Sequence, residues 1–405
     1  MSMVSKTNAK APWLPRPVIF LALVSFLNDI ASDIVIPLIP IVLATVLAAG
    51  PAALGLVEGV ADALAALLKL WAGRHSDRAG GRRKPLVIAG YVLSNLARPL
   101  IGLSGSWMTV LLLRSLDRVG KGIRSAPRDA MIGELTPPDR TGLAFGFHRA
   151  LDNFGAVLGG LTAAVVVYLV TADLATVLLL SAIPGAACVL LMVLGVQEPR
   201  KAPAAQRAKL PPLSWAMLSP PTRRYLLVLG LFTFARVSET FLVLRGHELG
   251  AGVLELLLLW SALNAAKALA SYPGGAVSDR LGRRAVLLAS WTAYAASFYF
   301  LSRLDTMAAL WIVVIVYGAF AGFSEGAERA LIDDMAPPSE RGTAFGWYYL
   351  VAGLAAIPAA VLFGALWQWA SVALAFSFAA AAACASALLL LLWVRPGQRA
   401  TALSV

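Results

Sequence analysis

One stretch of this 405-residue chain occurs twice, 200 positions apart. Residues 130–146 read AMIGELTPPDRTGLAFG and residues 330–346 read ALIDDMAPPSERGTAFG, so that Ala, Ile, Pro-Pro, Gly and Ala-Phe-Gly fall in register. A second pair has nearly the same spacing: GRHSDRAG at residues 73–80 and GAVSDRLG at residues 275–282, each followed by basic residues. A repeat of about half the chain, far longer than the ~20–50-residue periods of solenoids, predicts two similar halves in one molecule.

The residue content indicates that both halves lie in a membrane. Of all residues 59% are hydrophobic and only 14% are charged, whereas soluble domains are typically about 45–50% apolar and about 25% charged. Because about 20 apolar residues cross a bilayer, the chain divides into twelve predicted spans. These spans are Pro17–Val46, Ala52–Ala72, Pro85–Leu103, Trp107–Gly122, Gly142–Val170, Leu174–Val196, Tyr225–Leu244, Val253–Tyr272, Ala285–Ser302, Met307–Phe323, Thr343–Trp369 and Val372–Val394.

We therefore predict an all-α membrane protein whose twelve transmembrane helices form two pseudo-symmetric six-helix bundles. The bundles are residues 1–196 and 225–405, and a polar linker at 197–224 joins them. Most of the 34 Lys and Arg residues lie in the even-numbered loops and the two tails, with Lys121, Arg124 and Arg128 in one such loop. Since cytoplasmic loops carry this excess, both termini and the linker are expected to be cytoplasmic. The same placement accounts for the net charge of +12 without a nucleic-acid partner.

The doubled loop carries a family likeness. The pattern Gly-x-x-x-Asp-Arg-x-Gly, placed after the second span and again after the eighth, resembles the signature of the major facilitator superfamily. The likeness covers about Pro17 to Val394, and RSLDRVGKGIRSAPRDAMI resembles a poorly characterised prokaryotic subgroup. It implies a prokaryotic inner-membrane transporter with a site between its halves. It also implies that the loop latches the halves together, which gives gating roles to Gly73, Asp77, Arg78, Gly275, Asp279 and Arg280.

Acidic residues and one histidine inside the spans are the candidates for proton coupling, because an ionised side chain near the bilayer centre costs a few kcal/mol. Asp29 and Asp33 lie four residues apart on one face of the first span, and Asp29 is about 18 Å from its start. Two carboxylates so close disfavour the doubly charged form, which suits a reversible proton carrier. Asp62 has an acidic neighbour, Glu58, four residues before it, and His148 and Asp152 are also four residues apart. We expect proton coupling at Asp29, Asp33, Asp62, His148 and Asp152.

Basic residues at intermediate depth are more numerous than a latch needs. Arg149 stands three residues before Asp152, so these two can form a static ion pair, while His148 and Asp152 offer a proton relay instead. The planar guanidinium of Arg is suited to a carboxylate or a phosphate. We therefore expect substrate contacts from Arg98, Arg114, Arg149, Arg236, Glu239, Asn264 and Lys267.

These features favour a secondary active transporter, a symporter or an antiporter, that uses protons to move a small organic solute with an anionic group by alternating access. No Gly-x-x-x-x-Gly-Lys-Ser/Thr loop occurs, so direct use of ATP is not expected. No cofactor and no resident metal are expected, and a monomer is sufficient because one chain contains both halves. An enzyme is not expected, because no external domain could hold a catalytic constellation.

Three alternatives remain open at this point. The first is a drug-type proton antiporter that exports cationic or amphiphilic compounds. The second is a divalent metal-ion exporter, for which Asp29, Asp33 and Asp62 would supply hard oxygen ligands. The third is a membrane sensor that does not transport.

Overall fold

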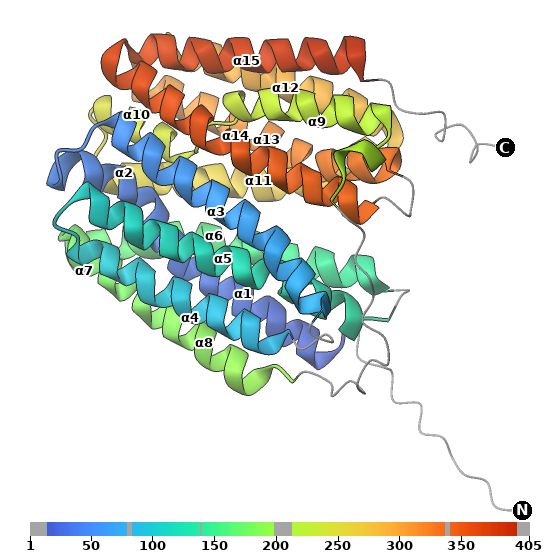
Figure 1. Ribbon diagram of the computed structural model, residues 1–405. Helices are drawn as coiled ribbons and strands as arrows, with labels where there is room; N and C mark the ends of the chain where they lie inside the picture. The colour runs from blue at the N-terminus through green and yellow to red at the C-terminus, as the bar shows by residue number, and fades with distance from the viewer. Residues whose placement is uncertain (1–13, 79–82, 138–139, 198–212, 337–340, 395–405) are drawn as a thin grey trace, which may run out of the picture.

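The computed structural model describes residues 14–78, 83–137, 140–197, 213–336 and 341–394, and this part of the chain contains helices and no strand (Figure 1). Ten of the helices are long and apolar enough to cross a membrane. Large apolar side chains point outward along them, for example Leu269 at 78% exposure and Leu194 at 71%. Contiguous apolar surface of this kind marks a protein that lies in a membrane. The chain is thus a multi-pass membrane protein.

The helices before residue 196 pack on one another and form a first group. This group contains α1 (Arg16–Val35), η1 (Ile36–Leu38), α2 (Ile39–Ile41), η2 (Val42–Val46), α3 (Pro51–Arg78), α4 (Lys84–Leu100), η3 (Ile101–Leu103), α5 (Trp107–Leu135), α6 (Thr141–Leu169), α7 (Leu174–Leu180) and α8 (Ala182–Gly195). The second group contains η5 (Trp215–Met217), α9 (Pro220–Ala235), α10 (Thr240–Glu248), α11 (Val253–Leu281), α12 (Arg283–Leu301), α13 (Met307–Met335), α14 (Arg341–Trp369) and α15 (Val372–Trp393).

The internal repeat of the sequence folds into the same helices twice. α5 and α13 begin at residues 107 and 307 and end at 135 and 335, and α6 and α14 begin at 141 and 341 and end at 169 and 369. Local sequence sets several of the starts: Ser106 accepts a hydrogen bond from Thr109 N at 3.3 Å, and Thr306 accepts one from Ala309 N at 3.3 Å. Side-chain oxygens at this position satisfy N–H groups that the first turn leaves free. The duplicated residues therefore specify a duplicated architecture.

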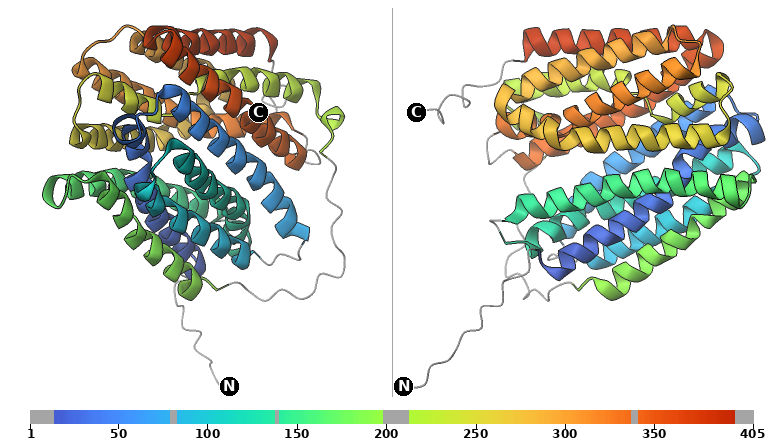
Figure 2. Two further views of the ribbon diagram at one scale, coloured as in Figure 1. Left: turned by 60° about the vertical axis from the view of Figure 1, so that its left-hand side comes forward. Right: turned by 180° about the vertical axis from the view of Figure 1, so that it is seen from behind.

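The two groups meet along two helix pairs, α3 with α14 and α6 with α11 (Figure 1). Glycines bring α3 and α14 together at the end of the molecule away from the start of α1. A Cβ on Gly55 would collide with the carbonyl oxygen of Ala360, and a Cβ on Gly364 would collide with that of Pro51. From this end the two groups diverge toward the end where α1 begins and α15 ends (Figure 2). We call the tightly packed end the far end.

Two helices run well past their predicted spans. The span Trp107–Gly122 belongs to α5, which continues to Leu135, and the span Met307–Phe323 belongs to α13, which continues to Met335. Lys121, Arg124 and Arg128 therefore lie within α5 and not in a loop. The drop in hydropathy that ends the predicted spans marks a charged helix face. α5 and α12 are not among the ten helices that composition alone qualifies as spans.

Candidate functional site

A stripe of charged side chains runs along one face of α5. Six residues recur at spacings of three or four, which places them on one side of the helix: Arg114, Asp117, Arg118, Lys121, Arg124 and Arg128. Met108 and Leu112 lie about 140° and 180° around the helix axis from Lys121, and both are exposed. α5 therefore turns an apolar side outward and a charged side inward.

Lys121 of α5 and Asp62 of α3 are exposed although both lie near the middle of their helices, about 21 Å and about 17 Å from the helix starts. On α3 the exposed apolar residues Leu67 and Trp71 lie about 140° and 180° around the axis from Asp62. Since these apolar residues mark the outer side, Asp62 and Lys121 face the interior. Solvent therefore reaches charged side chains inside the molecule at mid-depth.

Asp62 and Lys121 have no hydrogen-bond or ion-pair partner for their charged groups among the described residues. Lys121 is near enough to both Asp62 and Asp29 for Coulomb attraction. Asp29 is half-buried, and its Oδ1 accepts a hydrogen bond from Asn28 Nδ2 at 2.9 Å. We refer to Asp29, Asp62 and Lys121 as the open triad.

Arg98 and Arg114, in contrast, belong to a buried network of four charges. Arg98 Nε lies 2.8 Å from Asp117 Oδ1, Arg114 Nη1 lies 3.1 Å from Asp117 Oδ2, and Arg114 Nη2 lies 3.1 Å from Glu58 Oε2. The four side chains are at most 2% exposed. Arg98 Nη1 also donates to Asn28 Oδ1 at 3.0 Å. Two positive and two negative charges balance, so the network ties α1, α3, α4 and α5 together and leaves neither arginine free for a substrate.

His148 and Asp152 lie in a second polar chain between α1 and α6. His148 Nδ1 is 3.5 Å from Asp152 Oδ2, and His148 Nε2 is 2.9 Å from Ser25 Oγ. Ser25 Oγ also accepts a hydrogen bond from Arg128 Nη1 at 2.9 Å and lies 3.1 Å from Tyr91 Oη. Asp152 Oδ1 is buried without a hydrogen-bond partner in the described part of the chain. The chain of contacts runs from Asp152 through His148 to Ser25.

Arg236 and Lys267, the predicted basic site residues of the second group, are paired with carboxylates. Arg236 pairs with Glu328, which is buried and also accepts a hydrogen bond from Tyr348 Oη at 3.2 Å. Lys267 Nζ lies 2.8 Å from Glu239 Oε2. Arg236 and Glu239 stand at the two ends of a non-helical segment, since α9 ends at Ala235 and α10 begins at Thr240. Interrupted helices of this kind mark the substrate region of many transporters.

Arg149 forms an ion pair between the two groups. Its partner is Glu325 of α13, not Asp152 of its own helix, and the side chains are 44% and 32% exposed. Two further predicted residues lie where the groups meet. Asp33 is buried and its Oδ1 accepts a hydrogen bond from Trp260 Nε1 at 2.9 Å, and Asn264 Nδ2 donates to Trp260 O at 3.1 Å. Asp33 thus joins α1 to α11.

The residues of the doubled loop lie in the last turns of α3 and α11. Asp279 pairs with Arg283, which lies 3.6 Å from Asp334 of α13. Gly275 and Arg280 are in α11, and Gly73 is in α3 beside Ala126 of α5. Asp77 and Arg78 are the last residues of α3, and their side chains lie outside the described part of the structure. Every partner described for this loop belongs to the loop's own group of helices.

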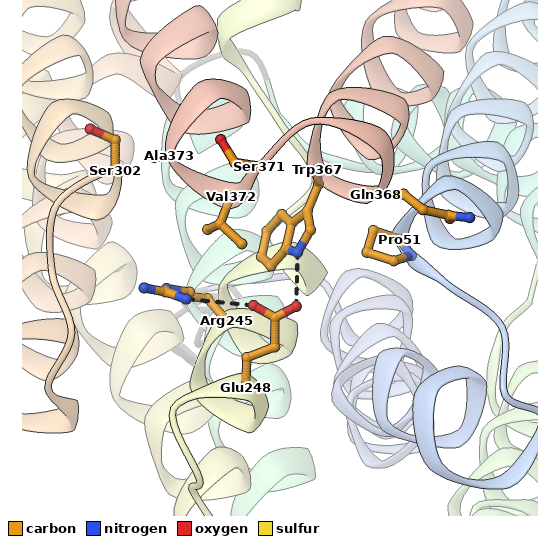
Figure 3. Close-up of a pocket in the computed structure, with 9 residues that line it drawn as sticks. All are labelled: Pro51, Arg245, Glu248, Ser302, Trp367, Gln368, Ser371, Val372 and Ala373. Atoms are coloured by element: carbon orange, nitrogen blue, oxygen red, sulfur yellow. Dashed lines mark hydrogen bonds and ion pairs between the residues drawn. The ribbon is translucent and has the colours of Figure 1, made fainter.

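A pocket of about 570 Å³ lies at the far end (Figure 3). Glu248 occupies its centre, where Oε1 accepts a hydrogen bond from Trp367 Nε1 at 2.8 Å and Oε2 faces Arg245 Nη1 at 3.5 Å. Gln368 lies at its edge and accepts a hydrogen bond from Ala52 N at 3.1 Å. Gln368 of α14 thereby caps the first turn of α3, so the pocket exists where the two groups are closed.

The described ranges contain no group of three or more His, Cys, Asp or Glu side chains that could hold a metal ion. Asp33 is bound to Trp260, and Asp29 and Asp62 are accompanied by the ammonium group of Lys121. A lysine beside two carboxylates competes with a divalent cation for them. These observations weigh against the metal-ion alternative.

An all-helical, multi-pass membrane protein with polar side chains between two groups of helices has the architecture of many secondary transporters. The chain belongs to the Major Facilitator Superfamily, whose family model matches residues 21–245 and 240–404. It is 30% identical over 376 residues to an uncharacterized MFS-type transporter of Methanocaldococcus jannaschii, across 90% of this chain and 92% of that protein.

Solved transporter structures share this fold. The nucleoside transporter NupG aligns with a TM-score of 0.74 at 14% identity, covering 93% of this chain and 98% of that one. A bacterial homolog of the human lysosomal transporter Spinster, in an inward-facing and unoccupied conformation, aligns with a TM-score of 0.69 at 17% identity, covering 95% and 96%. At such identities the likeness establishes the fold. The predicted family membership is confirmed.

Among the residues of the site that lie outside the predicted set are Lys121, Glu325 and Glu328. The sequence contains the signal for Lys121, because the charges of α5 recur at helical spacing beyond the point where hydropathy falls. Glu325 and Glu328 likewise lie three residues apart, just after the predicted end of their span at Phe323. Extending each span by its helical charge pattern would have found all three.

Proposed function

We propose that the protein is a secondary active transporter that couples protons to the movement of a small organic solute with an anionic group, by alternating access. The observation that supports this best is the open triad: three charges without an ion-pair partner among the described residues, of which Asp62 and Lys121 lie at mid-depth on faces turned away from lipid. Unpaired charge at this depth is costly unless water or a ligand compensates it, and it therefore marks a functional site. In the proposal the helices form twelve spans in two six-helix bundles, residues 1–196 and 225–405.

The topology follows from the basic loops. The linker 197–224 and both termini lie on the cytoplasmic side of a prokaryotic inner membrane, and the far end faces outward. The tight far end then corresponds to a state that is open toward the cytoplasm. Gly73, Asp77, Arg78, Gly275, Asp279 and Arg280 act on the cytoplasmic side when this state closes.

Each polar residue has a role in this proposal. Asp29 and Asp62 exchange protons with water because both side chains are at least partly exposed to solvent. His148 and Asp152 extend the proton path toward Ser25. Asp33 holds the contact between the groups.

Lys121 takes the anionic group of the solute, since its side chain is exposed at mid-depth and no ion pair holds its ammonium group among the described residues. Arg149, Arg236 and Lys267 meet the solute only after it displaces Glu325, Glu328 or Glu239.

A second candidate function has a specific observation in its favour. Two of the three open charges are carboxylates, and these would also suit a drug-type antiporter in which a cationic compound and protons compete for Asp29 and Asp62. The two functions predict opposite proton movements. A symporter carries protons into a vesicle together with its solute, whereas an antiporter releases protons as its cargo enters.

Proteoliposomes that contain a pH-sensitive dye test both functions. We expect inward solute gradients to move protons through the native protein, and Asp29→Asn to reduce this flux at least about tenfold, because the variant cannot carry the proton. Asp305→Asn is the matched control, since Asp305 is an exposed acid between α12 and α13. Proton flux that is unchanged in Asp29→Asn removes Asp29 from the coupling role. If no member of a panel of anionic and cationic solutes moves protons through the native protein, the proposed function is wrong.

A further inference from the structure

The spacing of the open triad bears on the charge of the solute. α3 and α5 pack closely, since a Cβ on Gly122 would lie 2.6 Å from Leu68 Cβ and 2.9 Å from the Ala65 carbonyl oxygen. Lys121 precedes Gly122 directly, and Asp62 stands three residues before Ala65. Both helices start at the far end, so the two charged residues differ in depth by about one helical turn, roughly 5 Å. An ammonium and a carboxylate thus face the same interior space from neighbouring helices.

No hydrogen bond or ion pair in the described part of the chain holds either charged group, whereas several buried charges nearby are paired. Arg98, Arg114, Asp117 and Glu58 balance one another, and Arg236 and Lys267 of the second group each pair with a carboxylate. Arg118 is buried and adds positive charge beside Asp62. The site therefore presents one solvent-exposed positive group, Lys121, and one solvent-exposed negative group, Asp62, with the half-buried Asp29 near the positive one.

A ligand of a single charge leaves half of this arrangement uncompensated. A simple anion at Lys121 brings its own negative charge beside Asp62 and Asp29, and a simple cation at Asp62 brings positive charge beside Lys121. Like charges at such close range are strongly unfavourable, and this is how charged sites reject the wrong partner. A solute with both charges places each beside its opposite.

We propose that the transported solute is zwitterionic, with its anionic group at Lys121 and its cationic group at Asp62. This rests on the proposed function and names the substrate class of the same site. Asp29 is then the group left for the proton, since Asn28 orients its carboxylate. The solute resembles an amino acid in its charges: a carboxylate and an ammonium group a few bonds apart.

Thermal stabilisation of the purified full-length protein by matched ligands tests the proposal. Each set contains an amino acid, the same molecule without its amino group and the same molecule without its carboxyl group. Suitable sets are leucine, 4-methylpentanoate and isoamylamine, and phenylalanine, 3-phenylpropionate and phenethylamine. We expect only the amino acid of a set to raise the melting temperature. Stabilisation by the acid or the amine alone, or by no member of any set, overturns the proposal.

Two variants connect the binding to the named residues. Lys121→Met and Asp62→Asn should each weaken the apparent affinity for the amino acid at least about tenfold, the effect of one lost charged contact. Leu112→Met and Leu67→Met, on the outer faces of the same helices, should leave it unchanged. Equal affinity in all four variants contradicts the assignment. The comparison of ligands on the native protein does not depend on whether these variants fold.

Failure of this inference differs from failure of the proposed function. If the protein moves protons together with a simple anion or cation in proteoliposomes while no amino acid binds, the transporter stands and the zwitterion is wrong. If amino acids bind but no solute moves protons, the site is assigned correctly and the coupled transport is wrong.

Discussion

At the scale of single residues, the depth and direction of Asp62 lead to a labelling prediction. In a background without Cys188 and Cys384, Asp62→Cys should react with a membrane-impermeant thiol reagent, because water reaches this side of α3 and the reactive thiolate forms in water. Leu67→Cys, about 140° around the same helix, faces lipid and should react at least about tenfold more slowly. Mass shift on a gel after timed exposure of proteoliposomes measures both rates. Equal rates at the two positions place Asp62 outside a water-filled interior.

The sequence predicts which helix carries a charged residue and where along that helix it lies, but it does not predict the ion-pair partner of that residue. Asp29 and Asp62 are in the helices where hydropathy placed them, and helical spacing also brought His148 next to Asp152. The ion pairs were out of reach, because Arg236 meets a residue 92 positions away and Arg149 meets Glu325 in the other group. The partners of such long side chains are determined by how the helices pack in three dimensions, and the order of residues along one helix does not specify that packing.

At the scale of helices, the buried four-charge network leads to a stability prediction. Asp117→Asn leaves Arg98 and Arg114 with too little negative charge in a site that is at most 2% exposed. Loss of one partner from a buried ion network costs about 3–5 kcal/mol. Arg329→Met, which removes a half-exposed ion pair with Glu325, should cost about 1 kcal/mol or less. Denaturation of the purified protein in mixed micelles measures the free energy of unfolding of both variants. Similar losses in the two variants would contradict a larger contribution from the buried network.

The helix boundaries separate what hydropathy can predict from what it cannot. Spans such as Leu174–Val196 and Val372–Val394 agree with α7 to α8 and with α15 within a residue, because their ends coincide with polar turns. The break between α9 and α10 was not predicted, since Arg236 to Glu239 contains neither Gly nor Pro. Its ends are held instead by Glu328 and Lys267. Tertiary ion pairs therefore stabilise a non-helical segment that the local sequence does not predict.

At the scale of the whole molecule, the two halves place different polar groups at equivalent positions. His148 and Tyr348 are 200 residues apart at the same site in α6 and α14, and Arg128 and Glu328 have the same relation in α5 and α13. His148 shares Ser25 with Arg128, while Tyr348 donates to Glu328. The repeat builds similar helices twice, and different residues at matched positions give the two halves different polar contacts.

Alternating access requires that the far end open, and this can be tested by joining the two groups there. In the background without native cysteines, Ala52→Cys and Gln368→Cys place thiols where α3 meets α14. Oxidation should cross-link the pair and reduce proton-coupled uptake in proteoliposomes at least about tenfold, because the groups can no longer part, and a reductant should restore it. The matched control is Glu248→Cys with Trp367→Cys, which joins α10 to α14 within one group and should leave uptake intact. Full uptake by the cross-linked Ala52–Gln368 pair would mean that the two groups need not separate at the far end during transport. Alternating access by opening of the far end would then be wrong for this protein, even though its fold is that of the superfamily.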